Sequence, residues 1–200
     1  MAGNMGRRFN KRKDMLLRFE RARRRNSVSA EPGVHDCILV LDGLKPDFNI
    51  GKIFRSADAF GALEIHLIGI RAFDPEPAKG SVRWVPFTMH DDFAACYQIL
   101  KQRGYAVITM EPECSMQLTH CTLAKKTAFV FGHEEFGFSF DPIQFPDIQR
   151  VSIPQWGRVQ SLNVSVAASI ALYEYVRRHG KKKASLKADL HAEEMERCLM

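Results

Sequence analysis

The chain contains 200 residues, of which 46% are hydrophobic, and it has a formal net charge of +6. This length fits one domain, and the apolar fraction is sufficient for a sizeable core, which excludes a chain that is disordered throughout. No apolar run reaches the roughly 18 residues that a membrane-spanning helix needs, and no signal-peptide pattern follows the first residues. We therefore expect a cytoplasmic protein without a membrane partner.

Positive charge is concentrated in residues 1–30, where ten basic residues and two acidic residues give a local charge of +8, and the rest of the chain carries about −2. This arginine density predicts binding to the phosphate backbone of RNA, although a solvated or targeting tail would have a similar composition. We expect this basic arm (residues 1–30) to be mobile by itself because it has few apolar residues, of which Met15, Leu16, Leu17 and Phe19 could form one side of a short helix. The candidate RNA-binding residues are Arg7, Arg8, Lys11, Arg12, Lys13, Arg18, Arg21, Arg23, Arg24 and Arg25.

Strand-like and helix-like segments alternate along the body of the chain. In chain order, the pattern predicts a strand over 36–44, a helix over 50–62, strands over 64–70 and 105–110 with a helix over 91–104 between them, strands over 127–132 and 151–154, and a helix over 161–180. Continuous apolar strands separated by helices predict an α/β fold with a mostly parallel sheet that is covered by helices on both faces. Residues 185–199 have the pattern of a short terminal amphipathic helix, within a tail that spans residues 181–200.

The five cysteines are scattered along the chain without any CxxC spacing, which favours reduced thiols over a disulfide framework. They are Cys37, Cys96, Cys114, Cys121 and Cys198. Cys114, His120 and Cys121 could suggest zinc, but a fourth ligand with recognisable spacing is missing. We therefore expect no metal.

Three loops that follow predicted strands are rich in polar residues and glycine. They contain the segments LKPDFNIGKIFRSADAFGA (44–62), FGHEEFGFS (131–139) and IPQWGRVQSLNVSVA (153–167). Each has an ordinary interpretation: the glycines as turns, Arg55 as a solvated residue, and Ser161 or Asn163 as a helix cap. The nucleotide-binding patterns GxGxxG and GxxxxGK[ST] are absent. The carboxyl ends of parallel strands meet at one edge of a sheet, so the three loops are expected to form one site.

These three segments resemble the three motifs of the SpoU (TrmH-like) RNA 2′-O-methyltransferases of the SPOUT superfamily, and the resemblance covers about residues 34–180. It implies a methyltransferase domain over residues 31–180 whose C-terminal part forms a deep trefoil knot. It also implies that S-adenosylmethionine binds in a bent conformation at the knot, and that the protein is an obligate homodimer. The helix over 161–180 would then bury its apolar face in the dimer interface.

The same resemblance assigns functional residues. The positions that match the family's catalytic residues are Asn49, Arg55, Glu134, Ser161 and Asn163, and those that match its cofactor pocket are Met110, Gly132, Ile153 and Leu162. A guanidinium has a pKa above about 12 and is a poor base, so we expect Arg55 to bind the adjacent phosphate and stabilise the developing alkoxide. Glu134 is expected to fix Arg55 through a charge-assisted pair, while Asn163 and Ser161 hold the hydroxyl. Gly157 is expected to allow a tight turn around the cofactor.

Some positions depart from the family pattern. His133 stands where the family often has Asn or a small residue, and Gln155 with Trp156 replaces a commoner pair that contains Met; Trp156 could therefore alter the pocket. The basic arm takes the place of the separate N-terminal RNA-binding domain of larger members, which resembles the compact tRNA-modifying members. We therefore expect tRNA as the substrate in preference to rRNA. The alternative is a catalytically silent RNA-binding or ribosome-assembly protein of the same fold.

Overall fold

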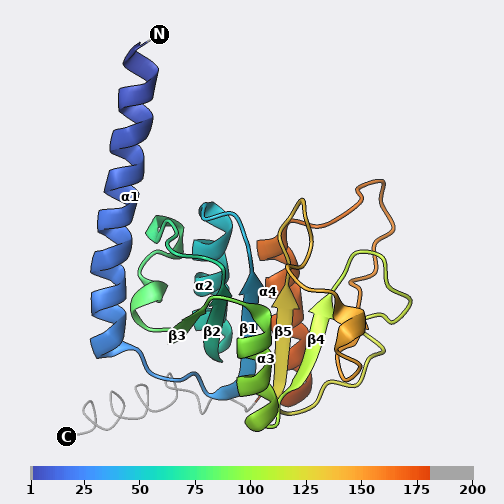
Figure 1. The fold of residues 1–200 in the computed structure, drawn as a ribbon. Coiled ribbons are helices and arrows are strands. Elements are labelled where there is room, and N and C mark those ends of the chain that lie inside the picture. The colour runs from blue at the N-terminus through green and yellow to red at the C-terminus, as the bar shows by residue number, and fades with distance from the viewer. Residues whose placement is uncertain (1, 181–200) are drawn as a thin grey trace, which may run out of the picture.

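Six parallel strands form one sheet in the order β3-β2-β1-β5-β4-β6 in the computed structural model of the protein, which describes residues 2–180 (Figure 1). The strands are β1 (His35–Asp42), β2 (Ala62–Ile68), β3 (Phe87–His90), β4 (Ala106–Met110), β5 (Thr127–Phe131) and β6 (Gln149–Val151). The central strands β1 and β5 are almost entirely buried, with Cys37 opposite Thr127 and Leu41 opposite Phe131. Their continuous apolar runs are typical of parallel strands that are covered on both faces.

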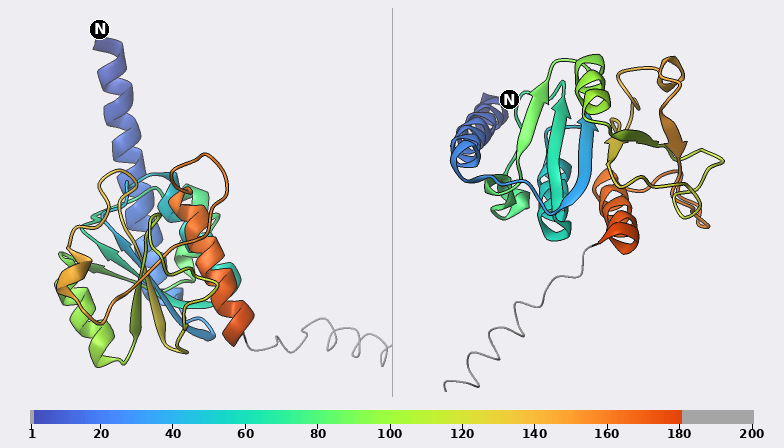
Figure 2. Two further views of the ribbon diagram at one scale, coloured as in Figure 1. Left: turned by 90° about the vertical axis from the view of Figure 1, so that its right-hand side faces the viewer. Right: turned by 90° about the horizontal axis from the view of Figure 1, so that it is seen from below.

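Helices cover both faces of this sheet, as Figure 2 shows. On one face, α2 (Phe48–Phe60) and α4 (Val164–His179) lie side by side and share a core with Leu39 and Leu41. On the other face, α3 (Phe93–Gln102) packs against Ile38 and Val40. Alternate residues of one strand therefore enter different layers, because successive side chains of a strand point to opposite faces.

The strands and helices predicted between residues 36 and 180 are confirmed, with boundaries that differ by a few residues. The structure adds the edge strand β3 and three short 3₁₀ helices, η1 (Glu76–Ala78), η2 (Ser81–Arg83) and η3 (Pro142–Gln144). Strand β3 alternates apolar Phe87 and Met89 with polar Thr88 and His90, but four partly exposed residues are too short a pattern to predict a strand from the sequence. The predicted helix over 185–199 lies outside the described residues. Within residues 2–180, none of the helices combines the length and the apolar character needed to cross a bilayer.

The basic arm forms a helix, α1 (Ala2–Ser29), that projects beyond the body of the protein (Figure 1). Its second half is anchored. Phe19 is 1% exposed and packs edge-on against Phe73, and Asn26 donates hydrogen bonds to the carbonyl oxygens of Val82 and Val85. The expectation of a mobile arm is therefore wrong for this half, because one aromatic and one buried amide are enough to fix it. Leu16 and Leu17, which could form one side of a helix with Phe19, are 42% and 48% exposed.

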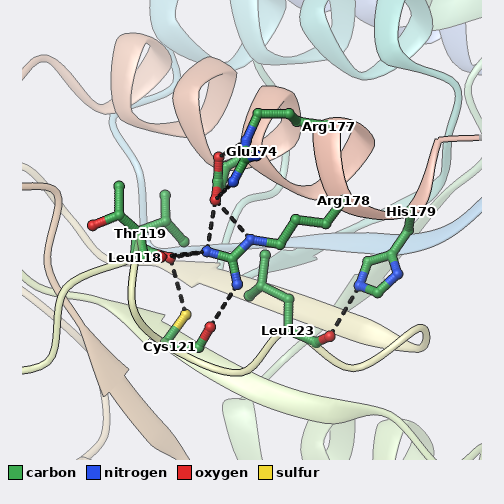
Figure 3. Close-up of polar contacts among 8 residues, drawn as sticks. All are labelled: Leu118, Thr119, Cys121, Leu123, Glu174, Arg177, Arg178 and His179. Atoms are coloured by element: carbon green, nitrogen blue, oxygen red, sulfur yellow. Dashed lines mark hydrogen bonds and ion pairs between the residues drawn. The ribbon is translucent and has the colours of Figure 1, made fainter.

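The loop between β4 and β5 is bound to the C-terminal end of α4, mainly through Arg178 (Figure 3). The Arg178 guanidinium donates to the carbonyl oxygens of Cys121 at 2.6 Å, Leu118 at 2.8 Å and Thr119 at 2.9 Å. His179 lies 2.9 Å from the Leu123 carbonyl oxygen, and the Tyr175 hydroxyl donates to that of Lys125. A loop without regular structure thus obtains partners for its backbone from helix side chains.

Glu174 completes this arrangement from the preceding turn of α4. Its buried carboxylate accepts hydrogen bonds from Arg177 and Arg178 (Figure 3). The Arg177 and Arg178 contacts lower the pKa of Glu174 to about 2, against the opposing effect of burial. Glu174 is therefore ionised throughout the neutral range, and it holds the Arg178 guanidinium toward the loop.

Replacement of Arg178 should destabilise the fold far more than replacement of its neighbour Arg177. We expect Arg178→Met to lower the free energy of unfolding by about 2 kcal/mol, because loop carbonyl groups lose their donors. The matched control Arg177→Met removes only a more exposed ion pair and should cost less than about 1 kcal/mol. Urea unfolding followed by circular dichroism measures both values, and equal losses would contradict a specific role for Arg178.

Candidate functional site

A cavity of about 640 Å³ lies at the carboxyl ends of β4, β5 and β6. Its wall contains all four predicted cofactor residues, Met110, Gly132, Ile153 and Leu162, together with Glu134 and Ser161. Met110 ends β4, Gly132 directly follows β5, and Ile153 follows β6 by two residues. The three strands thus bring to one edge segments that are separated in the sequence, as expected for a parallel sheet.

The loop over residues 132–139 forms a rigid rim of this cavity. Gly132 and Gly137 approach so closely that a Cβ on Gly132 would lie 2.7 Å from the carbonyl carbon of Gly137, so position 132 requires glycine. The buried Asp42 at the end of β1 accepts hydrogen bonds from the backbone N–H and the hydroxyl of Ser139. Burial raises the pKa of Asp42 and these two bonds oppose the rise. The rim is therefore tied to the central strand of the sheet.

His133 shapes the tip of the same loop. Its Nδ1 accepts from the backbone N–H groups of Glu135 and Phe136, and its ring stacks on Phe136 with centroids 4.7 Å apart. Because Nδ1 accepts, the proton of the neutral ring is on Nε2. His133, which departs from the family pattern, thus has a structural role within the loop.

Four polar residues from three segments form a continuous chain of hydrogen bonds, which we call the amide relay: Glu134, Asn49, Asn163 and Ser165. Asn49 Nδ2 donates to Glu134 Oε1 at 2.7 Å, and Asn163 Nδ2 donates to Asn49 Oδ1 at 3.2 Å. Asn163 Oδ1 in turn accepts from the backbone N–H and the hydroxyl of Ser165. Each amide is therefore fixed at both its oxygen and its nitrogen.

Ser161 and Asn163 have different roles at the start of α4. Asn163 is the N-cap, because its side chain accepts from the Ser165 backbone N–H. The helix begins at Val164, so Ser161 lies outside it, is exposed and lines the cavity. Capping thus accounts for Asn163, and the position of Ser161 is explained only by the cavity.

Arg55 lies apart from the residues that the motifs group with it. It is on α2, is exposed, and makes no hydrogen bond or ion pair with any residue in the described part of the chain. It is also absent from the cavity wall. The predicted Arg55–Glu134 pair is therefore wrong within one chain, because Glu134 accepts from Asn49 instead.

Two expectations for the loop after β6 are also corrected. Trp156 is 91% exposed and does not line the cavity. Gly157 has no left-handed backbone conformation, and a Cβ there would meet nothing within 4 Å, so the fold of this chain does not require glycine.

The cavity wall also contains residues that the motifs did not identify, including Glu111, Gln155 and Gln160. Glu111 is held by Arg150 and by the Thr109 hydroxyl. Gln155 Oε1 is buried and accepts no hydrogen bond from any described residue. Glu111 directly follows the strand predicted over 105–110, and its place at a carboxyl end was a signal that could have identified it.

The described side chains of the basic arm lie mostly on the surface of α1. The exposed ones are Arg12, Lys13, Arg21, Arg23, Arg24 and Arg25. Arg18 is half-buried and lies 3.4 Å from Asp74, so its charge is partly neutralised. Most of the predicted RNA-binding side chains that the structure describes are therefore free to contact a polyanion.

Residues 36–173 match the model of a family described as the SpoU rRNA Methylase family. The chain is 34% identical to a tRNA (guanosine(18)-2′-O)-methyltransferase of Thermus thermophilus over 84% of this chain and 88% of that protein. It is 35% identical to the 23S rRNA (guanosine-2′-O-)-methyltransferase RlmB of Nitrosomonas europaea over 74% of this chain and 58% of that protein.

Solved structures give the same result. The TrmH/SpoU tRNA modifying enzyme of A. aeolicus superimposes with a TM-score of 0.67 and 28% identity, over 84% of this chain and 90% of that one. The SpoU methyltransferase AviRb of Streptomyces viridochromogenes, in complex with AdoMet, has a TM-score of 0.64 and 27% identity over 73% of this chain and 58% of that one. With its three motifs gathered at one edge of the sheet, the chain belongs to the SpoU RNA methylase family.

Proposed function

We propose that this protein is an S-adenosylmethionine-dependent RNA methyltransferase that methylates a ribose 2′-hydroxyl, with tRNA as the preferred substrate. The observation that carries this proposal is the cavity at the carboxyl ends of β4, β5 and β6, which has the amide relay at its rim. The tRNA relative is matched over 88% of its length and the rRNA relative over 58%, which favours tRNA. The four described cysteines are unpaired thiols, in keeping with a cytoplasmic enzyme.

The cavity suits S-adenosylmethionine in its chemistry. Apolar side chains such as Phe131, Leu162 and Val164 line it together with polar residues such as Glu111, Gln155 and Ser161. Met110, Gly132, Ile153 and Leu162 would hold the cofactor, which supplies an electrophilic methyl group. No metal is needed for this chemistry, because alignment of a nucleophile with an activated methyl is sufficient.

The residues at the rim would position the RNA. The amide relay presents fixed hydrogen-bond groups on Asn163 and Asn49, and the nearby Ser161 hydroxyl can donate to or accept from the ribose. Because the Glu134 carboxylate accepts from Asn49, the amide nitrogen atoms of Asn49 and Asn163 point toward Glu134 and their oxygen atoms point away from it. These groups bind and orient the 2′-hydroxyl before reaction, which is the main contribution expected from such a site.

A C-terminal trefoil knot is part of the proposal. The segment after β6 leaves the sheet edge beside β4, and α4 then packs against β1 and β5. The loop between β4 and β5 is bound to α4 through Arg178, Tyr175 and His179. Helix α4 therefore contacts both the sheet and the loop between β4 and β5, which supports a chain path in which α4 passes through that loop.

A homodimer is proposed on two observations about α2 and α4. Both helices expose large apolar side chains, with Phe48 60%, Tyr173 58% and Val166 46% exposed. Arg55 is exposed on α2 and does not reach the cavity of its own chain. A symmetric dimer that covers these helices would bury the apolar side chains and bring Arg55 of the partner subunit toward the cavity.

The amide relay should be required for methyl transfer but not for cofactor binding. Asn49→Asp replaces a donor by a carboxylate beside Glu134, so the two acids repel and the relay breaks. We expect kcat to fall on the order of 100-fold while the affinity for S-adenosylhomocysteine is unchanged. The matched control is Gln144→Glu, the same amide-to-acid change at an exposed position. Wild-type turnover in Asn49→Asp would refute this role for the relay.

Arg55 should require its guanidinium. Arg55→Ala and Arg55→Lys should both abolish methyl transfer and leave the dimer and cofactor affinity intact, because lysine keeps the charge but loses the planar fork. Lys52→Ala, one turn away and also exposed, should retain activity. Methylation assays and sedimentation measure these outcomes, and near-normal turnover of Arg55→Lys would contradict phosphate binding by the fork.

A mixture of two inactive variants tests whether Arg55 acts across the dimer. Arg55→Ala and Asn163→Ala subunits, unfolded and refolded together in equal amounts, should recover roughly a quarter of wild-type activity if each cavity uses the partner's arginine. If Arg55 acts within its own chain, every cavity in the mixture lacks one group and no activity returns.

The basic arm should contribute to RNA affinity and to its dependence on salt. Deletion of the whole arm would expose the packing partners of Phe19, so substitution is the cleaner change. Replacing Arg21, Arg24 and Arg25 by Gln should weaken RNA binding and reduce the log–log salt slope by about 0.7 to 0.9 per lost phosphate contact. Lys101, Lys125 and Lys126, near the amino ends of β4 and β5, serve as the matched triple control. Unchanged affinity and slope in the arginine variant would indicate a solvated tail.

A further inference from the structure

Three potential metal ligands meet at the edge of the sheet that is occupied by β2 and β3. They are His66 in β2, His90 at the end of β3, and Cys96 in the first turn of α3, and their ligand atoms all lie within 4.8 Å of one another. None of them lines the cavity described above. His66 faces α3, because its strand neighbours Ile65 and Leu67 belong to the core on the opposite face.

Hydrogen bonding alone does not satisfy this cluster. His66 Nδ1 lies 2.9 Å from His90 Nε2 and 3.3 Å from Cys96 Sγ, so two groups compete for one ring nitrogen. A ring nitrogen carries either one proton or one lone pair, so it cannot bond fully to both. His66 is 1% exposed, so water does not supply the missing partner.

The surroundings of His66 resemble the outer shell of a metal site. The Glu64 carboxylate lies 3.3 Å from His66 Nε2 and is itself paired with Arg103. A carboxylate on one side of a histidine keeps the proton on that nitrogen and leaves the lone pair of the other nitrogen available to a metal. The two histidine rings are nearly parallel, with centroids 4.8 Å apart, and the ligand atoms of all three residues lie within 4.8 Å of one another.

A metal ion binds the thiolate form of cysteine and the neutral form of histidine, so an ion at this cluster would displace the Cys96 thiol proton.

We infer that His66, His90 and Cys96 form a structural binding site for Zn²⁺ or a similar borderline transition-metal ion. Two imidazoles and a thiolate suit zinc or cobalt and do not suit magnesium or calcium, which prefer oxygen ligands. His90 is half-buried, so water can occupy the fourth position of a tetrahedral ion. The ion would tie the four-residue edge strand β3 to β2 and α3. This inference is independent of the proposed methyltransferase function, because its residues lie outside that site.

Metal binding by untagged protein tests the inference directly. After treatment with a chelator and its removal, the wild-type protein should bind one Zn²⁺ per chain by isothermal titration calorimetry, and Zn²⁺ should raise its melting temperature. Co²⁺ should give the d–d bands of a tetrahedral ion and a thiolate-to-metal charge-transfer band. Wild-type protein that binds neither ion stoichiometrically would overturn the inference.

Variants locate the site. Cys96→Ala should lose the charge-transfer band, and His90→Ala, on the edge strand, should lower Zn²⁺ affinity on the order of 100-fold or more. Glu64→Gln should weaken binding by about 10- to 100-fold without removing the band. Cys114→Ser is the matched control, because that thiol donates to the Arg150 carbonyl at another edge of the sheet and should not affect binding. Retention of the band in Cys96→Ala, or its loss in Cys114→Ser, would place the metal elsewhere and contradict the assignment.

Discussion

Helix α4 is fixed at both ends, and the positions of the other parts of the molecule follow from this constraint. At its start, Asn163 caps the helix and binds Asn49 of α2. At its other end, Arg178 binds three carbonyl groups of the loop between β4 and β5. A helix held in this way cannot slide by a residue without breaking one of the two sets of bonds. The cavity lies beside its first turn and therefore has a defined shape.

The neighbouring helix α2 takes its position from the same constraint. Ser56 of α2 and Ser169 of α4 are 2.8 Å apart, and Ser169 also donates to the Ser165 carbonyl. Three residues of the amide relay, Asn49, Asn163 and Ser165, thus stand on or cap two helices that are bonded along their length as well as at their ends. Groups that are supported by regular elements in this way need little reorganisation when a substrate binds, which suits a reaction that depends on alignment.

The two edges of the sheet have separate roles. The cavity lies at the carboxyl ends of β4, β5 and β6, in the half of the sheet that ends with β6. The His66, His90 and Cys96 cluster lies in the other half, at the outer strands β2 and β3. Strand β3 also contacts the anchored part of α1, since Phe19 lies near Phe87. A metal ion that stabilises β3 would therefore also support the base of the basic arm, from which the exposed arginines extend.

The sequence by itself determined the alternating α/β layout, the positions of the main helices and strands, and the three loops that form the site. These features depend on local periodicity and on residues that are close in the sequence, such as Gly132 and Gly137, which approach each other within one tight loop. Only the tertiary structure decided which side chains meet. Asn49 and Asn163 are 114 positions apart, Glu134 binds Asn49 and not Arg55, and Phe19 anchors an arm that its few apolar residues suggested would be mobile. Such contacts depend on the distance and direction between elements that are remote in the chain, and no local pattern of residue types records these quantities.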